Sequence, residues 1–157
     1  MKLVLLRIDD RLIHGQVAVG WSRTLSAERV VVVNDAVAKD STQKFLLQMA
    51  APSGISVTFF SVRDAVQAIQ EDKFGNGRLI VLARSPIDIL ALIEGGLQVE
   101  KVNIGNVRYA EGKKKLTKEV SADEEELVAM TKMKEMGIRL EAQWLPDHKI
   151  TLINDYL

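Results

Sequence analysis

The segment RIDDRLIHGQ, residues 7–16, gathers two arginines, two aspartates and one histidine within eight residues. Such a cluster is costly to bury, and its density of charge is unusual for ordinary surface. A neutral imidazole beside two guanidinium groups suits phosphoryl transfer, because the imidazole is a nucleophile and guanidinium groups bind phosphoryl oxygens. We therefore predict that His14 is the nucleophile and that Arg11 and Arg7 bind the transferred group.

His14 is also predicted to begin a helix, HGQVAVGWSRTL, shortly after the strand-like run that opens the sequence. The exposed N–H groups and the positive end of the helix dipole favour an anion and disfavour an imidazolium at that place. We expect a neutral His14 with a lone pair free to attack. Gly15 and Gln16 are assigned to phosphate binding or to support of the loop.

Asp9 and Asp10 leave alternatives open. Together with His14 they could hold a metal ion, but two fixed cations beside them oppose a divalent ion and no second histidine is near. We predict no metal, and expect the aspartates to orient the arginines and pin the loop, although one of them could cap the helix. The plain structural alternative for His14 is a capping histidine between surface ion pairs.

The paired aspartates also resemble the acidic strand end of response-regulator receiver domains, which accept phosphate on an α/β fold. Those domains need an aspartate at the end of the third strand, a lysine at the end of the fifth, and magnesium. Here the two strands end in TFFS and VNIGN, with neither residue, and the arginines would compete with magnesium. We reject that assignment.

Strand-like and helix-like segments alternate along the chain. The apolar runs KLVLL, RVVVVN, ISVTFF, RLIVLA and KVNIG are typical of parallel strands buried on both faces, and IRLEAQWL alternates like a further strand. After the first helix, further helices are predicted over 40–50, 61–70, 85–94 and 121–136. Asp40 with Gln43 and Ser121 with Glu124 form capping-box patterns. This order predicts one α/β domain, residues 1–157, with a parallel sheet between helices.

The polar residues gather where a parallel sheet binds its ligands, at the carboxyl ends of the strands. The His14 loop lies there, together with four other polar stretches: Asn34–Asp35, Ser61, Arg84–Ser85 and Asn103–Asn106. We therefore expect one site at this edge.

Other residues are assigned to structure. NVRYAEGKKKLTKEVS breaks the alternation and is predicted to form a hairpin or an extended arm, with lysines 113–115 in a solvated turn rather than a basic contact patch. His148 is assigned to a surface loop, and Trp21 and Trp144 are assigned to packing.

The composition excludes several classes of protein. Lys plus Arg and Asp plus Glu both number 21, and this zero net charge argues against a nucleic-acid binder. Cysteine is absent, which fits a reducing compartment. No run of about 18 apolar residues exists, so we expect no membrane-spanning helix, and the opening MKLVLLRIDDR is too short an apolar run for a signal peptide.

RIDDRLIHGQV, followed in order by VVVNDAVAKD, AAPSGISV, EGG, VNIGN and SADEEE, closely resembles the IIB component of the mannose/fructose/sorbose class of the bacterial sugar phosphotransferase system. The resemblance implies a three-layer α/β/α sandwich with a mainly parallel sheet in the order 3-2-4-1-5-6. It implies that His14 accepts phosphate from the phosphohistidine of a IIA protein, at Nδ1, and passes it to a sugar entering through the membrane subunits IIC and IID. It implies no cofactor, no nucleic acid, and a cytoplasmic protein held at the membrane by IIC and IID.

That strand order has consequences for the site. Strand 1 would lie between strands 4 and 5, so Arg84 and Ser85 should flank His14, and Ser85 or an N–H beside it should share the phosphate. IIA and the membrane subunits should share one face, apolar around Val17 and Trp21. Relatives specific for N-acetylgalactosamine often show VNIGN, which makes a hexosamine the first sugar to test. A phosphate-responsive regulatory domain of the same fold is the alternative that is not an enzyme.

Overall fold

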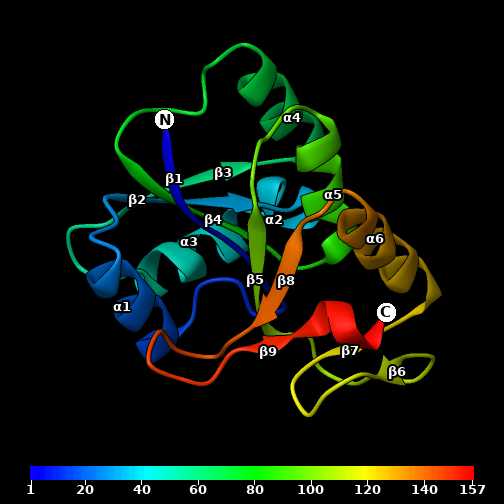
Figure 1. Cartoon of the computed structure of the whole chain (residues 1–157). Helices are drawn as coiled ribbons and strands as arrows, with labels where there is room; N and C mark the ends of the chain where they lie inside the picture. Colours follow the sequence, from blue (N-terminus) through cyan, green and yellow to red (C-terminus); the bar gives the residue numbers. More distant parts are fainter.

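The computed structural model describes all 157 residues, and its centre is a seven-stranded sheet in the order β3-β2-β4-β1-β5-β8-β9 (Figure 1). Six strands are parallel, and β9 runs antiparallel to its neighbour β8. The strands are β1 (Lys2–Asp9), β2 (Arg29–Val33), β3 (Ser56–Phe60), β4 (Arg78–Ala83), β5 (Lys101–Asn106), β8 (Arg139–Ala142) and β9 (Thr151–Leu152). Because β8 is the sixth strand of this sheet along the chain, the expected order 3-2-4-1-5-6 is confirmed, with one short antiparallel strand added.

Helices cover both faces of the sheet, which confirms the three-layer arrangement (Figure 1). They are α1 (Gly15–Thr24), α2 (Asp35–Ala38), α3 (Ser41–Ala50), α4 (Val62–Gln70), α5 (Pro86–Glu94) and α6 (Glu124–Glu135), with a final 3-10 turn at Ile153–Tyr156. None of them is both long and apolar enough to cross a membrane.

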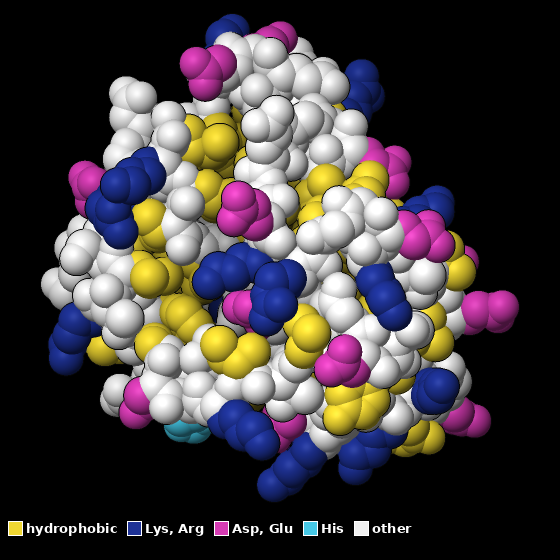
Figure 2. Space-filling view, viewed as in Figure 1, with side chains coloured by type: hydrophobic (Ala, Val, Ile, Leu, Met, Phe, Trp, Pro, Cys, Tyr) yellow, Lys and Arg dark blue, Asp and Glu magenta, His cyan; other side chains and the backbone are white.

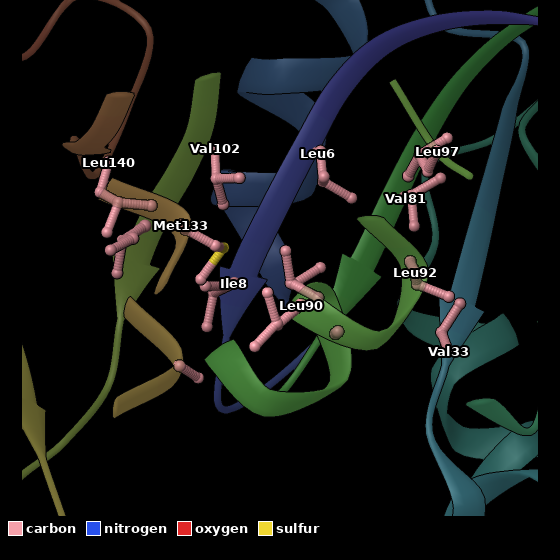
Figure 3. Close-up of a cluster of buried hydrophobic side chains, with 14 of the residues drawn as sticks. Leu6, Ile8, Val33, Val81, Leu90, Leu92, Leu97, Val102, Met133 and Leu140 are labelled. Carbon is pink, nitrogen blue, oxygen red and sulfur yellow. The ribbon is translucent and has the colours of Figure 1, made fainter. Parts of the chain in front are cut away.

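Two apolar cores hold these layers together. One contains 26 buried residues from the sheet and from α4, α5 and α6; Figure 3 shows Leu6 and Ile8 of β1 in the same cluster as Leu90 and Met133 from the helices. The other contains 11 buried residues from the opposite face of the sheet and from α1, α2 and α3. The nearly unbroken apolar strands of the sequence follow from this burial on two faces.

Most helix starts lie where the sequence predicts them. Asp40, Ser61 and Ser85 each occupy an N-cap position, and each side chain accepts a first-turn N–H. The start of α6 is different, because the capping box is formed by Asp123 and Glu126 rather than by Ser121 and Glu124. Ser121 donates its N–H to the Val107 carbonyl at 2.8 Å, so a neighbouring segment already engages its backbone. The short helix α2 was not predicted, since four residues carry too little periodicity.

The predicted hairpin is confirmed. It consists of β6 (Lys114–Lys115) and β7 (Ser121–Ala122), which pair antiparallel. Lys114 and Lys115 are exposed, as expected for a solvated turn. Lys113 is not simply solvated, because its Nζ lies 3.0 Å from Glu126 Oε1 of α6 and so ties the hairpin to that helix.

One face of β5 and β8 has no helix in front of it (Figure 1). Figure 2 shows basic side chains around an acidic one over these strands, and Glu141 pairs there with Arg139 at 3.0 Å and Lys101 at 3.8 Å. A cleft of about 540 Å³ lies beside the amino-terminal half of β1, where β1 and β5 are not yet paired. Asn103 and Gln143 line it, whereas Asp9, Arg11 and His14 do not.

Candidate functional site

The loop that joins β1 to α1 is anchored by its apolar residues. Leu12 and Ile13 are buried in the core under α1, and the Leu12 N–H donates to the Asp9 carbonyl at 3.0 Å. Leu12 has a φ of 59°, a left-handed conformation that costs of order 1–3 kcal/mol for a residue with a side chain. The burial of the two apolar side chains offsets this cost and leaves Arg11 and His14 only partly covered.

Arg7 lies beneath this loop with a side chain only 2% exposed. Its Nη1 donates to Asn103 Oδ1 and to the Gln143 carbonyl at 2.9 Å, and its Nη2 donates to Asp9 Oδ2 and to the Trp144 carbonyl, both at 3.2 Å. Burial lowers the pKa of Arg7, and Asp9 opposes that effect. The protein itself encloses the guanidinium and occupies Nη1 and Nη2, which fits a supporting role, and direct binding of phosphoryl oxygens by Arg7 stays a prediction.

Asp9 is the acceptor at the centre of the site, and its side chain is fully buried. Its Oδ2 accepts from Arg7 and lies 3.0 Å from His14 Nε2, while its Oδ1 accepts from the Arg11 main-chain N–H at 3.1 Å. Burial by itself raises the pKa of Asp9, but the bond to His14, the charge of Arg7 and the N–H of Arg11 hold it below its usual value. Asp9 is therefore an ionised carboxylate at neutral pH.

His14 occupies the N-cap position of α1, as predicted, but its side chain makes no capping bond. The ring is held by Asp9 through Nε2 and is 19% exposed. A second contact comes from Trp144, whose ring centroid lies 5.8 Å from that of His14 at an interplanar angle of 56°. The side chain of His14 therefore does not cap the helix, and its contacts with Asp9 and Trp144 restrict its rotation.

Arg11 is held differently from Arg7. Its guanidinium carbon lies 5.0 Å from the centroid of the Trp144 ring. Its Nε and Nη2 are covered and have no hydrogen-bond partner in the protein. Buried N–H donors that remain unpaired are unfavourable, by about 1–3 kcal/mol each. The protein therefore leaves two donors of Arg11 unsatisfied at this position.

Asp10 faces the hairpin rather than Arg11. Its Oδ2 accepts from both the main-chain N–H and the Nε of Arg108, each at 2.9 Å, and its Oδ1 is buried without a partner. Asp9 pairs with Arg7, one of the two predicted arginines, Asp10 joins the loop to the hairpin through Arg108, and neither aspartate caps α1. The structure groups no three histidine, aspartate or glutamate side chains in a way that could hold a metal ion.

The strand order brings Arg84 and Ser85 to the same edge. β4 lies beside β1 with Ala83 opposite Ile8, so the next residues follow at the level of the His14 loop. The Ser85 Oγ accepts the Ile87 N–H at 3.1 Å and caps α5, which leaves its O–H free to donate. Participation of Arg84 and Ser85 in phosphate binding stays a prediction.

The glycine and glutamine that follow His14 form the first turn of α1. Gly15 has a φ of 38°, which favours glycine, and Gln16 is exposed. Val17 and Trp21 are buried, so neither contributes exposed apolar area to the predicted docking face, which stays a prediction. They pack against the sheet instead.

Gly105 belongs to the site although the sequence analysis did not single it out. A methyl group at this position would overlap the Arg7 guanidinium and lie 2.7 Å from Asp9 Oδ2. Only a residue without a side chain lets the ion pair lie against β5. A glycine in the middle of an apolar strand is the signal that could have found it, because it marks close approach of other groups to the backbone.

The sequence analysis also missed the segment that follows β8. It supplies the Gln143 and Trp144 carbonyls to Arg7 and the Trp144 ring to Arg11 and His14. Trp144 packs against the core under α1, as predicted, and the contacts of its ring with Arg11 and His14 come in addition to that packing. Main-chain acceptors leave no signal in a sequence, because every residue carries the same carbonyl.

Comparison with known proteins decides the family. The family described as "PTS system sorbose subfamily IIB component" matches residues 3–157. The chain belongs to this family. The sorbose-specific EIIB component of Lacticaseibacillus casei is 36% identical to this IIB component over 141 residues, which are 90% of this chain and 86% of that one.

Solved structures and fused relatives agree with this assignment. The IIBSor domain of the sorbose permease from Klebsiella pneumoniae has a TM-score of 0.92 at 35% identity, covering 99% of this IIB chain and 96% of that one. The mannose-specific EIIAB component of Escherichia coli K12 is 37% identical over 143 residues, which are 91% of this chain and 44% of that relative. Other relatives of this IIB component are named for fructose and N-acetylgalactosamine.

Proposed function

We propose that this IIB component carries a phosphoryl group on His14, which it receives from the phosphohistidine of a IIA protein and passes to a sugar held by the membrane subunits IIC and IID. In the first step the N–P bond on IIA breaks as an N–P bond forms on His14. In the second step that bond breaks as a P–O bond forms to a sugar hydroxyl, whose proton is released.

The partners in this proposal rest on the relatives. Their names support a sugar of the sorbose, mannose, fructose or N-acetylgalactosamine class. The relative named as an EIIAB component supports a IIA donor. With these partners, the protein acts at the cytoplasmic face of the membrane and associates there with IIC and IID.

The observation that carries the proposal is the contact between Asp9 and His14. The Nε2 of His14 lies 3.0 Å from Asp9 Oδ2. An ionised carboxylate can only accept, so Nε2 carries the proton in this pair. In the neutral ring the lone pair then resides on Nδ1, which is the nitrogen expected to form the bond to phosphorus.

The surroundings suit the charge that the phosphoryl group brings. Arg11 has two N–H donors without partners, and the first turn of α1 has no side-chain cap. Guanidinium groups and helix N-termini both stabilise phosphoryl oxygens. In this proposal Arg11 contacts the phosphoryl group and Arg7 positions Asp9, with Gly15, Gln16 and Ser85 as further donors.

The test of the first step is phosphorylation by phosphorylated IIA, mapped by mass spectrometry under mild alkali, where a phosphohistidine survives. Label should appear on His14 and be absent from His14→Ala. His148→Ala is the matched control, because the other histidine of the chain is 49% exposed, its ring faces Asp147 rather than His14, and its loss should leave labelling unchanged. Wild-type labelling of His14→Ala would overturn the assignment.

The second step separates the transfer enzyme from the regulatory alternative. Membranes that contain IIC and IID are added to the labelled protein together with candidate sugars. Loss of label to a sugar phosphate supports the IIB function proposed here. Label that stays on His14 with every sugar would instead support a phosphate-responsive regulatory domain.

A further inference from the structure

We propose that Trp144 is a positioning residue of the His14 site, and that its ring holds the Arg11 guanidinium without taking the N–H bonds that phosphoryl oxygens can accept when the side chain turns toward them. This inference rests on the function proposed above. It concerns a side chain that carries no ionisable group and that the sequence alone assigns to packing.

The main chain of Trp144 is fixed independently of its ring. Its carbonyl accepts from Arg7 Nη2 at 3.2 Å and from Trp21 Nε1 at 3.0 Å. The Gln143 side chain braces the same loop by donating to the carbonyls of Pro146 and His148, at 3.0 and 2.9 Å. The loop is therefore held in place by bonds that a substitution of the Trp144 side chain does not remove.

The ring projects from this fixed point toward two residues of the site. It lies 5.0 Å from the Arg11 guanidinium carbon and 5.8 Å from the centroid of the His14 ring. The face of an indole attracts a guanidinium through its quadrupole. The imidazole of His14 is already held by Asp9, so the effect proposed for the indole ring is its hold on the Arg11 guanidinium.

An aromatic partner has an effect that a carboxylate cannot have. A carboxylate would bind the N–H groups of Arg11 in pairs and would repel an incoming phosphoryl group. The indole ring attracts the same cation through its face, adds no negative charge and accepts none of the N–H bonds. The unpaired Nε and Nη2 of Arg11 are what this arrangement predicts.

The first experiment compares Trp144→Leu with Trp144→Phe in single-turnover phosphorylation by phosphorylated IIA. Trp144→Leu should lower the maximal rate about tenfold, the size of a partly desolvated cation–π contact, and should leave the half-saturating IIA concentration unchanged. Trp144→Phe keeps an aromatic face and should stay within about threefold of the wild type. Equal rates for Trp144→Leu and wild type would overturn the proposal.

The second experiment is a double-mutant cycle, which distinguishes an effect that acts through Arg11 from a general structural effect of the Trp144 ring. In an Arg11→Ala background, Trp144→Leu should cause no further loss, because the ring acts through the guanidinium. A further tenfold loss in that background would show that the ring acts elsewhere and would overturn the proposal.

A third measurement distinguishes failure of this inference from failure of the proposed function. In a Trp21→Phe background, Trp144 is the only tryptophan, and its emission reports on the Arg11 contact without any IIA. Arg11→Ala should shift that emission. If it shifts while wild-type protein takes no phosphate from IIA, the proposed function fails and the contact stands; if it does not shift, the positioning role is overturned.

Discussion

Arg7 lies near the end of β1 and Arg11 lies four residues later, in the loop that follows this strand. The hydrogen bonding of their two guanidinium groups is opposite. Arg7 is enclosed, and the protein occupies its Nη1 and Nη2 with two side chains and two carbonyls. Arg11 rests on an aromatic ring, and two of its donor nitrogens lack partners. The first arrangement places a cation inside the scaffold, and the second leaves two covered donors without partners. Under the proposed function, the same residue type in one short motif serves once in the scaffold and once in phosphate binding.

The largest effect should come from removing the enclosed cation. Arg7→Met leaves the buried Asp9 carboxylate without its ion-pair partner, so the free energy of unfolding should fall by about 3–5 kcal/mol. Urea denaturation measures this loss, with Arg23→Met as control, because Arg23 is exposed in the last turn of α1 and should change stability by less than about 0.5 kcal/mol. If Arg7→Met were as stable as the control, the scaffold role of Arg7 would be wrong.

Substitution of Arg11 should have the opposite balance of effects, with a large loss of transfer rate and a small loss of stability. Arg11→Ala should slow phosphorylation by IIA by about 10²–10³-fold, as expected for loss of one preorganised donor group, while the free energy of unfolding changes by less than about 1 kcal/mol. Arg11→Lys keeps the charge but loses the planar donor pair, and it should remain impaired. A wild-type transfer rate in folded Arg11→Ala would contradict the distinction between the two arginines.

A smaller effect is expected from crowding the enclosed pair. Gly105→Ala pushes a methyl group into the space of Arg7 and Asp9 and should lower stability by about 1–3 kcal/mol. Much of that loss should disappear in an Arg7→Met background, where no guanidinium needs the space. An undiminished loss in that background would place the strain in β5 itself.

The smallest effect concerns Asp88, a partly buried carboxylate whose pKa is raised, whereas that of Asp9 is lowered. Burial and the neighbouring Asp35 raise the pKa of Asp88 to about 6. Because the folded pKa lies above the unfolded value, ionised Asp88 disfavours the fold above pH 6, and the fold gains stability as pH falls toward 4. Asp88→Asn should stabilise the protein at pH 7 by about 1 kcal/mol, a value reduced for solvent screening at a partly exposed site. Thermal unfolding at pH 4 and pH 7 checks this, since the gain should vanish at pH 4.

The sequence predicted the architecture because the signals for it are local. Apolar runs bounded by polar ends indicated the strands of the parallel sheet, and a serine or aspartate marked the starts of α3, α4 and α5. The order of the strands came from resemblance to the IIB family, since pairing between distant strands has no local signature. The start of α6 shows where local signals fail. Ser121 and Asp123 are both suitable caps, and only a contact with the distant Val107 carbonyl engages the Ser121 backbone and leaves the cap to Asp123.

The same difference between local and non-local signals decided which site residues the sequence revealed. His14, Arg11 and Asp9 were found because their types and spacing indicate phosphate chemistry. The enclosure of Arg7 was missed because an arginine is rarely buried, and because it depends on carbonyls 136 and 137 residues further along the chain. Gly105 and the contacts of the Trp144 ring were missed because neither residue carries a formal charge that would mark it as part of a site.

The carbonyl of Trp144 has a consequence for how such a protein can evolve. It joins β1, α1 and the segment after β8 through bonds to Arg7 and Trp21, and every amino acid at this position would supply the same oxygen. Selection can therefore exchange the side chain at position 144 without dismantling the scaffold, as long as the new residue tolerates the same backbone path. The main chain of a single residue thus belongs to the fixed frame while its side chain is free to vary, so single substitutions at position 144 can change the surroundings of Arg11 and His14 while the fold stays intact.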